Sequence, residues 1–406
     1  VDGNQENANK LPMFNTPNLV EPILTWERIR TTDVGLDLGF LNNELSVGFD
    51  WYQRENTDML APSQVLPQVL GTDAPMANAG TLRTRGWELT LDWHHRFGEF
   101  NVYANFNLAD SKTVVTKWES KAKLLNQNYS GKTYGDIWGF ETDRYFEESD
   151  FTGQNADGTW NYANGIASQK GLEQGSFHYG PGDVKFKDLD GNGVIDGGDG
   201  TADNHGDLKV IGNFLPRYEY SFHLGGAWRG FDLDLFFQGV GKRHVWTVSS
   251  MNFPLMREAD LAIYDHQMSY NRVIYKNGLK DVERYEVNQA NKYPRLFPGN
   301  DPQGTISVID AGTNNYYPQS RYLTDMSYLR LKNVTLGYTL PKELTRKAYI
   351  QKARIYFSAN NLFLLYKGND LPVDPEINAG AGLAYGGWGR TAPITRTFSF
   401  GMQVTL

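Results

Sequence analysis

The sequence feature with the clearest chemistry is a run of oxygen-bearing side chains between residues 188 and 199. At the spacing of an EF-hand calcium loop it offers Asp188, Asp190, Asn192, the Val194 carbonyl, Asp196 and Asp199. Oxygen ligands at this spacing wrap one hard cation, and Gly193 occupies the sharp-turn position. The last position holds Asp instead of Glu, and the flanking residues do not predict helices. We therefore expect residues 182–199 to form an EF-hand-like loop whose Ca²⁺ orders the chain, with a metal-free Asp/Gly turn as the alternative.

Aromatic side chains in the predicted long connections are the second group with binding potential, because such rings can stack on sugar faces. Tyr385 and Trp388 are the strongest candidates, since the glycines around them allow a ligand to approach the backbone closely. Trp138 and Tyr316 are further candidates for substrate contact. The alternative for each ring is a place in the small hydrophobic cores that long ordered loops need.

The sequence contains no arrangement that predicts catalysis, so we expect no enzyme. The acidic pair Glu147–Glu148 fits a solvated loop, and adjacent residues of a strand, such as His94 and His95, face opposite sides. Neither a nucleophile elbow nor a phosphate loop is present. The absence of cysteine excludes disulfides and thiolate metal sites, and a net charge of −8 argues against a nucleic-acid partner.

The elements that must position these residues are strands, because apolar and polar residues alternate with period two along most of the chain. The runs lie in residues 34–40, 45–52, 87–93, 100–108, 218–228, 231–237, 328–339, 354–363 and 398–406. Their connections alternate strictly between short and long, the long ones covering about residues 53–86, 118–216, 247–321 and 367–393. We also expect a bulge near Asn333, a helical turn within residues 341–352, and two further strands near residues 136–146.

Length and spacing of the runs favour strands that cross a membrane. A tilted strand needs about 9–11 residues to cross a bilayer, and outer-membrane barrels join such strands by tight turns at one end and long loops at the other. The sequence thus predicts an all-β fold, an antiparallel up-and-down transmembrane β-barrel portion of about 8–10 strands with long extracellular loops. The alternatives are a soluble β-rich carbohydrate-binding or glycoside-cleaving protein, and a self-closed small barrel acting as an adhesin.

Several motifs in one order resemble the SusC/RagA-type TonB-dependent transporters of the bacterial outer membrane. They include FLNNELSVGFDWYQRENTDML at residues 40–60, GDVKFKDLDGNGVIDGGD at 182–199, YLRLKNVTLGYTLP at 328–341 and RIYFSANNLF at 354–363. The DPE triplet at 374–376 and TRTFSFGMQVTL at 395–406 complete the series, which covers nearly the whole chain.

The resemblance implies import of oligosaccharides or peptides across the outer membrane, with energy supplied through TonB and a SusD-like lipoprotein as a lid. It also implies that residues 1–406 are the C-terminal part of the barrel, since no plug domain or TonB-contact segment is identified in them. An open sheet edge in hydrocarbon leaves backbone groups unpaired at a cost of several kcal/mol each. We therefore expect the rest of a larger barrel to complete the sheet within the lipid bilayer.

Overall fold

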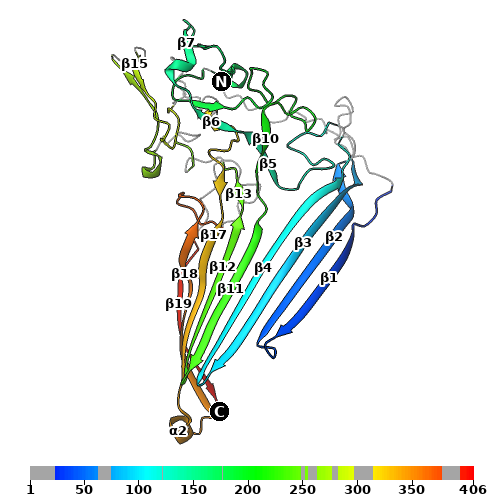
Figure 1. Ribbon diagram of the computed structural model, residues 1–406, viewed down its shortest axis with the longest axis vertical. Coiled ribbons are helices and arrows are strands. Elements are labelled where there is room, and N and C mark those ends of the chain that lie inside the picture. Colours follow the sequence, from blue (N-terminus) through cyan, green and yellow to red (C-terminus); the bar gives the residue numbers. More distant parts are fainter. Residues whose placement is uncertain are drawn as a thin grey trace, which may run out of the picture.

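The computed structural model describes residues 23–62, 75–120, 122–175, 177–247, 252–254, 263–276, 282–296, 314–376 and 394–406. Its main element is one nine-stranded antiparallel sheet of long, tilted strands (Figure 1). In spatial order the strands are β1 (Arg28–Phe40), β2 (Leu45–Pro62), β3 (Met76–Phe97), β4 (Phe100–Lys117), β11 (Arg217–Trp228), β12 (Phe231–Lys242), β17 (Tyr328–Thr339), β18 (Lys352–Lys367) and β19 (Thr397–Thr405).

The register of the sheet sets apolar residues beside apolar residues on one face. Phe49 pairs with Leu89, and Leu336 pairs with Phe357, which in turn faces Phe400. Because side chains alternate along each strand, the same register collects carboxylates, amides and hydroxyls on the opposite face. We refer to these as the apolar face and the polar face of the sheet.

The apolar face is not covered by any other described part of the chain. Phe49 is 41% exposed and Phe400 is 80% exposed, and large apolar side chains stay open along β1, β12 and β19 as well. A soluble sandwich would bury this face in its core. The exposure agrees with the predicted outward-facing apolar wall, and among the described residues no second sheet packs on this face as in a sandwich.

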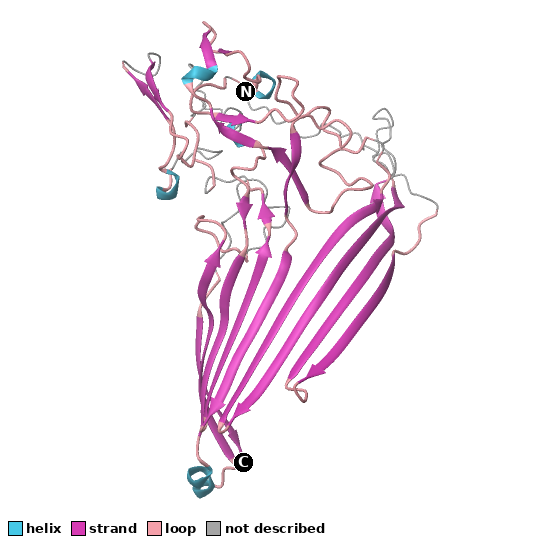
Figure 2. Cartoon of the chain, viewed as in Figure 1, coloured by secondary structure: helices cyan, strands magenta, loops and turns pink. Residues whose placement is uncertain are grey.

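Short turns and long connections lie at opposite ends of the sheet (Figure 2). The short end holds residues 41–44, 98–99 and 229–230, together with the C-terminus and α2 (Lys342–Thr345). The predicted helical turn after Pro341 is thus confirmed, and so is the bulge near Asn333, where the β17 register shifts. None of the helices among the described residues is long and apolar enough to cross a membrane.

Two predictions about the long connections were wrong. Part of the expected 53–86 connection is strand, since β2 runs on to Pro62 and β3 starts at Met76; these extensions lack a continuous apolar face, so alternation did not reveal them. The strands expected near residues 136–146, β5 (Asp136–Phe140) and β6 (Thr142–Tyr145), pair within the loops and not in the main sheet.

The long connections fold into a layer of short elements above the sheet, which we call the loop layer (Figure 1). Its remaining strands are β7 (Phe151–Gln154), β8 (Trp160–Tyr162), β9 (Val184–Phe186), β10 (Leu208–Asn213), β13 (His244–Val245), β14 (Arg272–Tyr275), β15 (Val282–Glu286) and β16 (Thr324–Asp325). Its short 3-10 helices are η2 (Glu148–Asp150), η3 (Lys170–Leu172), η4 (Asp265–Gln267) and η5 (Asn314–Tyr316).

The main sheet has two open edges in the described residues, since β1 pairs only with β2 and β19 only with β18. The alternative of a small self-closed barrel is therefore wrong for this arrangement. The fold is an antiparallel, up-and-down segment of barrel wall, as the strand pattern predicts.

The rings of three tyrosines on the polar face occupy the space beside a glycine of the neighbouring strand. Tyr103 is directly opposite Gly225 in the register, and Tyr52–Gly86 and Tyr356–Gly401 repeat the arrangement. A Cβ placed on Gly225 would come within 2.1 Å of the Tyr103 ring. The missing side chain on one strand thus makes room for the ring from the next, a packing device that also stabilises designed sheets.

Candidate functional site

Charged side chains on the polar face pair with one another across neighbouring strands. Arg354 Nε donates to Asp232 at 2.9 Å, and Asp234 accepts from the Tyr103 hydroxyl while it contacts His223 Nε2 at 2.6 Å. Amide and hydroxyl groups continue this pattern between the charged residues of the sheet. The polar face is therefore a hydrogen-bonded surface with fixed charges, suited to contact with water and polar solutes.

Residues 368–376, which follow β18, turn back onto β17, and we call them the fold-back segment. Arg330 lies 2.5 Å from Asp374 Oδ2 and 2.5 Å from Glu376 Oε1, and Lys332 Nζ donates to Glu376 at 2.5 Å. The Arg330 side chain is only 6% exposed. Leu371 and Val373 pack on Met326, so the segment is held by apolar contacts as well as by charge. Asp374 and Glu376 of the DPE triplet thus hold the fold-back segment against β17.

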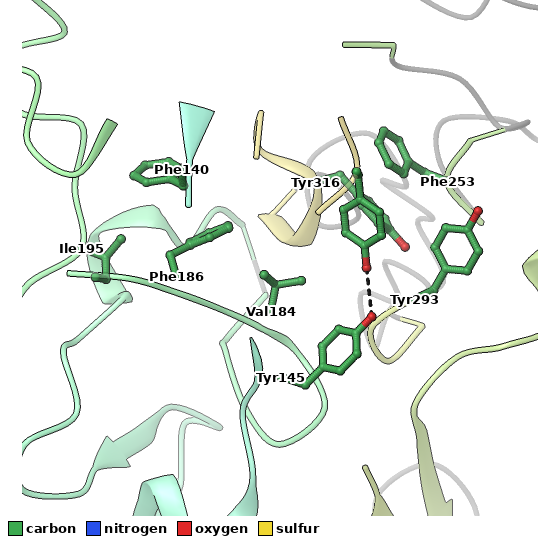
Figure 3. Packing of buried hydrophobic residues seen from close by; sticks show 9 residues of the cluster. Phe140, Tyr145, Val184, Phe186, Ile195, Phe253, Tyr293 and Tyr316 are labelled. Atoms are coloured by element: carbon green, nitrogen blue, oxygen red, sulfur yellow. Dashed lines mark hydrogen bonds between the residues drawn. The ribbon is translucent and has the colours of Figure 1, made fainter. Parts of the chain in front are cut away.

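The loop layer has its own aromatic cores, as the alternative reading of the loop rings predicts. In one cluster the Phe253 and Tyr316 rings stack at 4.3 Å, and the Tyr145 hydroxyl lies 3.2 Å from that of Tyr322 (Figure 3). Arg321 lies 4.3 Å above the Tyr145 ring. A second cluster gathers Phe146, Phe151, Phe177 and Tyr179. These cores allow long connections to hold a defined shape.

Of the four aromatic rings predicted to contact substrate, the structure describes those of Tyr316 and Trp138. Tyr316 is 7% exposed inside the first cluster, where burial raises its pKa well above the ordinary value, so it packs the loops and does not present a free ring. Trp138 is half-buried in β5, with its ring 5.3 Å from His205. Tyr385 and Trp388 lie outside the described residues. The substrate-contact prediction for Tyr316 is therefore corrected, while those for the other three stay predictions.

A cleft of about 360 Å³ opens in the loop layer beside the first aromatic cluster, and the sequence pattern did not reveal it. Its walls include Lys292, Tyr293, Arg321, Tyr322, Asp325 and Asp370. Lys292 and Asp370 form an ion pair at 2.6 Å, and the rings of Tyr293 and Tyr322 stack at 5.9 Å. Tyr293 and Tyr322 are almost fully buried, so the cleft presents chiefly polar and charged groups, which suit a polar organic ligand.

The predicted calcium loop brings together a different carboxylate set from the one that spacing suggests. Single oxygen atoms of Asp188, Asp190 and Asp207 all lie within 4.8 Å of one another. Among the described residues, Asp196 and Asp199 do not belong to this group. The sequence pattern did not reveal Asp207, because this residue follows the predicted loop. Asp207 is fully buried, and its Oδ1 accepts a hydrogen bond from the backbone N–H of Leu189 at 2.6 Å.

The other predicted ligands shape the turn itself. Asn192 Oδ1 accepts from the Val194 backbone at 2.7 Å, and Asp196 Oδ1 accepts from the Gly198 backbone at 2.7 Å. Val194 also forms an isolated bridge with Ser168, which ties the loop to the rest of the layer. Because three carboxylates converge beside this ordered turn, their oxygens match the ligand preference of Ca²⁺.

Glu141 joins three segments of the loop layer and gives it a pH dependence. Its hydrogen bonds from Lys187 and Lys209 lower the pKa of Glu141 from 4.5 to about 2. A lowered folded-state pKa contributes stability above about pH 4.5, and that contribution disappears as the pH falls to about 2. We expect Glu141→Gln to cost less than about 1 kcal/mol near neutral pH, because water screens exposed pairs. Thermal unfolding of both proteins across this pH range should show the difference vanish at the acid end; a constant difference would contradict the assignment.

The chain is similar in sequence to several TonB-dependent receptors. It is 27% identical over 433 residues to TonB-dependent receptor P3 of Formosa agariphila, covering all of this chain and 36% of the relative. It is 24% identical to TonB-dependent receptor SusC of Bacteroides thetaiotaomicron, covering 90% of this chain and 31% of SusC. The chain thus spans about a third of the length of the curated relatives it matches. No family model matches the sequence.

Solved structures share the fold. The RagAB peptide transporter matches with a TM-score of 0.58 and 23% identity, over 93% of this chain and 35% of that chain. The RagAB peptide importer in its open-open state matches equally well, at 0.58 and 21% identity. At these identities the likeness is one of fold, and it agrees with the observed wall of long antiparallel strands.

Proposed function

Because the chain is homologous to the barrel portion of SusC/RagA-type TonB-dependent transporters, which are outer-membrane proteins, we propose that it forms one side of the barrel of an importer. In this proposal residues 1–406 are the C-terminal part of that barrel, and other strands of the same transporter cover the open edges of β1 and β19. The observation that carries it is the uncovered apolar face opposite a charged polar face, which suits lipid on one side and a water-filled lumen on the other.

The cargo we propose is an oligosaccharide or a peptide, taken up with energy from TonB and delivered with a SusD-like surface lipoprotein. The loop layer would then be extracellular, and the short turns periplasmic. Trp138, Tyr385 and Trp388 are proposed as stacking surfaces for the cargo. The cleft beside Tyr293 and Tyr322 adds a second polar surface at the same end of the barrel.

Uptake by cells that carry the full-length transporter tests this proposal. We expect saturable accumulation of a labelled oligosaccharide or peptide that is lost on deletion of the gene and on dissipation of the proton gradient. Replacement of Tyr385 and Trp388 by alanine should weaken uptake without lowering the amount of folded protein. If panels of both cargo classes accumulate equally in the deletion strain, the importer proposal is wrong.

We propose further that Asp188 and Asp190 bind Ca²⁺ with help from Asp207, and that the ion orders the loop layer. Ligand present at about 100 times its dissociation constant stabilises a folded protein by about 2.7 kcal/mol. The melting temperature of the full-length transporter should therefore rise with Ca²⁺ and fall with a chelator, and Asp188→Asn with Asp190→Asn should abolish the response.

Asp199→Asn is the matched control for the calcium experiment. If the cluster with Asp207 holds the ion, this variant keeps the calcium response. If the EF-hand spacing governs, Asp199→Asn weakens binding, because this residue then supplies the last ligand of the loop. A wild-type melting temperature that does not respond to Ca²⁺ would contradict the calcium proposal as a whole.

A further inference from the structure

The link between β17 and β18 differs from the other connections at the short end of the sheet. It covers residues 340–351, which we call the basic turn, and contains α2 and η6 (Arg346–Ala348), whereas residues 98–99 and 229–230 turn tightly. Its backbone is closed by hydrogen bonds, with Ile350 N donating to Thr345 O at 3.1 Å and Gln351 N to Thr405 O at 2.9 Å. The basic turn therefore has a defined, hydrogen-bonded backbone and is not an irregular loop.

Cations on the basic turn have no carboxylate partner among the described residues. Lys342, Arg346 and Lys347 are exposed, as is Lys352 directly after the turn, and none of the four forms an ion pair within the described ranges. Arg229 of a neighbouring turn, by contrast, pairs with Glu99 at 2.6 Å. The turn also carries one exposed carboxylate, Glu343, so the four cations leave a local net positive charge. In a chain of net charge −8, this local excess of positive charge favours an anionic partner.

Two apolar side chains project from the same turn. Tyr349 is 92% exposed and adopts a positive φ of 60°, a region that residues with a side chain rarely occupy. Leu344 is 57% exposed. The backbone thus adopts an unfavourable conformation while the tyrosine ring points away from the protein. Tyrosine beside Lys and Arg is the combination found at membrane interfaces.

The basic turn lies at the end of β17 and β18, beyond strands whose apolar faces are open (Figure 1). We propose that it binds the headgroups of anionic phospholipids in the inner leaflet of the outer membrane, with Tyr349 and Leu344 inserted at the interface. The inference rests on the membrane orientation given under Proposed function, but not on the cargo. Lipid phosphates would supply the missing counter-charge, while the ring and the leucine replace water contacts with acyl chains.

Site-specific fluorescence quenching tests the proposal. This chain contains no cysteine, so Gln351→Cys in the full-length transporter, with any cysteine elsewhere replaced by serine, gives one labelling site next to Tyr349. The labelled protein is placed in nanodiscs containing either brominated phosphatidylglycerol or brominated phosphatidylcholine. We expect stronger quenching by the anionic lipid.

The triple variant Lys342→Gln, Arg346→Gln, Lys347→Gln should remove the preference for the anionic lipid. Each neutralised cation is expected to weaken lipid association about fivefold. The matched control, Lys117→Gln, Lys170→Gln, Lys276→Gln, removes exposed cations from the opposite end and should keep the preference. Tyr349→Ser should lower quenching by both lipids alike. Equal quenching of the wild type by both lipids, or none by either, would overturn the proposal.

Discussion

Phe400→Arg is expected to destabilise the transporter by about 2–4 kcal/mol in a bilayer, whereas Ser399→Arg on the next residue should change stability little. The two positions are exposed neighbours on β19 that point to opposite faces. If both faces were in contact with water, an arginine at either site would change the stability little, because both side chains are solvent-exposed. Only lipid on the apolar face makes the two substitutions unequal.

The comparison is made by urea unfolding of full-length protein refolded into lipid vesicles, with heat-modifiable gel mobility as a check on folding. The same pair of variants in detergent micelles should differ less, because a micelle adapts to a surface charge more easily than a bilayer does. Equal losses for Phe400→Arg and Ser399→Arg in vesicles would mean that the apolar face does not contact lipid. The importer proposal would then lose the observation that carries it.

Arg330→Met is expected to cost about 3–5 kcal/mol, because it leaves Asp374 and Glu376 without their main counter-charge in a mostly buried site. Removing one member of a buried ion cluster leaves the remaining charges uncompensated, which is worse than losing the whole cluster. The triple variant Arg330→Met, Asp374→Asn, Glu376→Gln should therefore recover much of the lost stability.

Chemical unfolding of the full-length transporter measures this series, and limited proteolysis of residues 368–376 reports on the fold-back segment itself. Arg330→Met should expose the segment to protease before the sheet unfolds. Lys332→Met is the comparison variant, with a smaller expected loss, since Lys332 is 21% exposed and has Glu376 as its one ion-pair partner in the described ranges. A triple variant that is less stable than Arg330→Met would show that the carboxylates act independently of the arginine.

The wall of the sheet could be predicted from sequence because its signal is local. The alternation lies within single strands, from Val34 to Phe40 in β1 and from Phe231 to Phe237 in β12, and lipid on one face keeps that alternation clear. The strand extensions at Gln53–Pro62 and Met76–Gly86 were not predicted from the sequence. They lie beyond the apolar face, where strand pairing does not require apolar and polar residues to alternate. Their pairing depends on the partner strand and not on their own pattern.

The candidate sites were less predictable because they depend on contacts between distant residues. Asp207 joins Asp188 and Asp190 only through the folding of the loop layer. Tyr316 belongs to a core completed by Phe253 and Tyr322, and no local pattern separates a packed ring from a free one. The role of the DPE triplet likewise emerges only when Arg330 is placed beside it.

The tyrosines seated on glycines have a consequence for assembly. If β11 slid past β4 by two residues, every side chain would keep its face, but Tyr103 would meet His223 or Ala227 in place of Gly225. The ring has room only over a residue without a side chain. Each such pair therefore disfavours a shifted register between its two strands. Whatever the order in which the strands enter a membrane, these pairs favour the same final register.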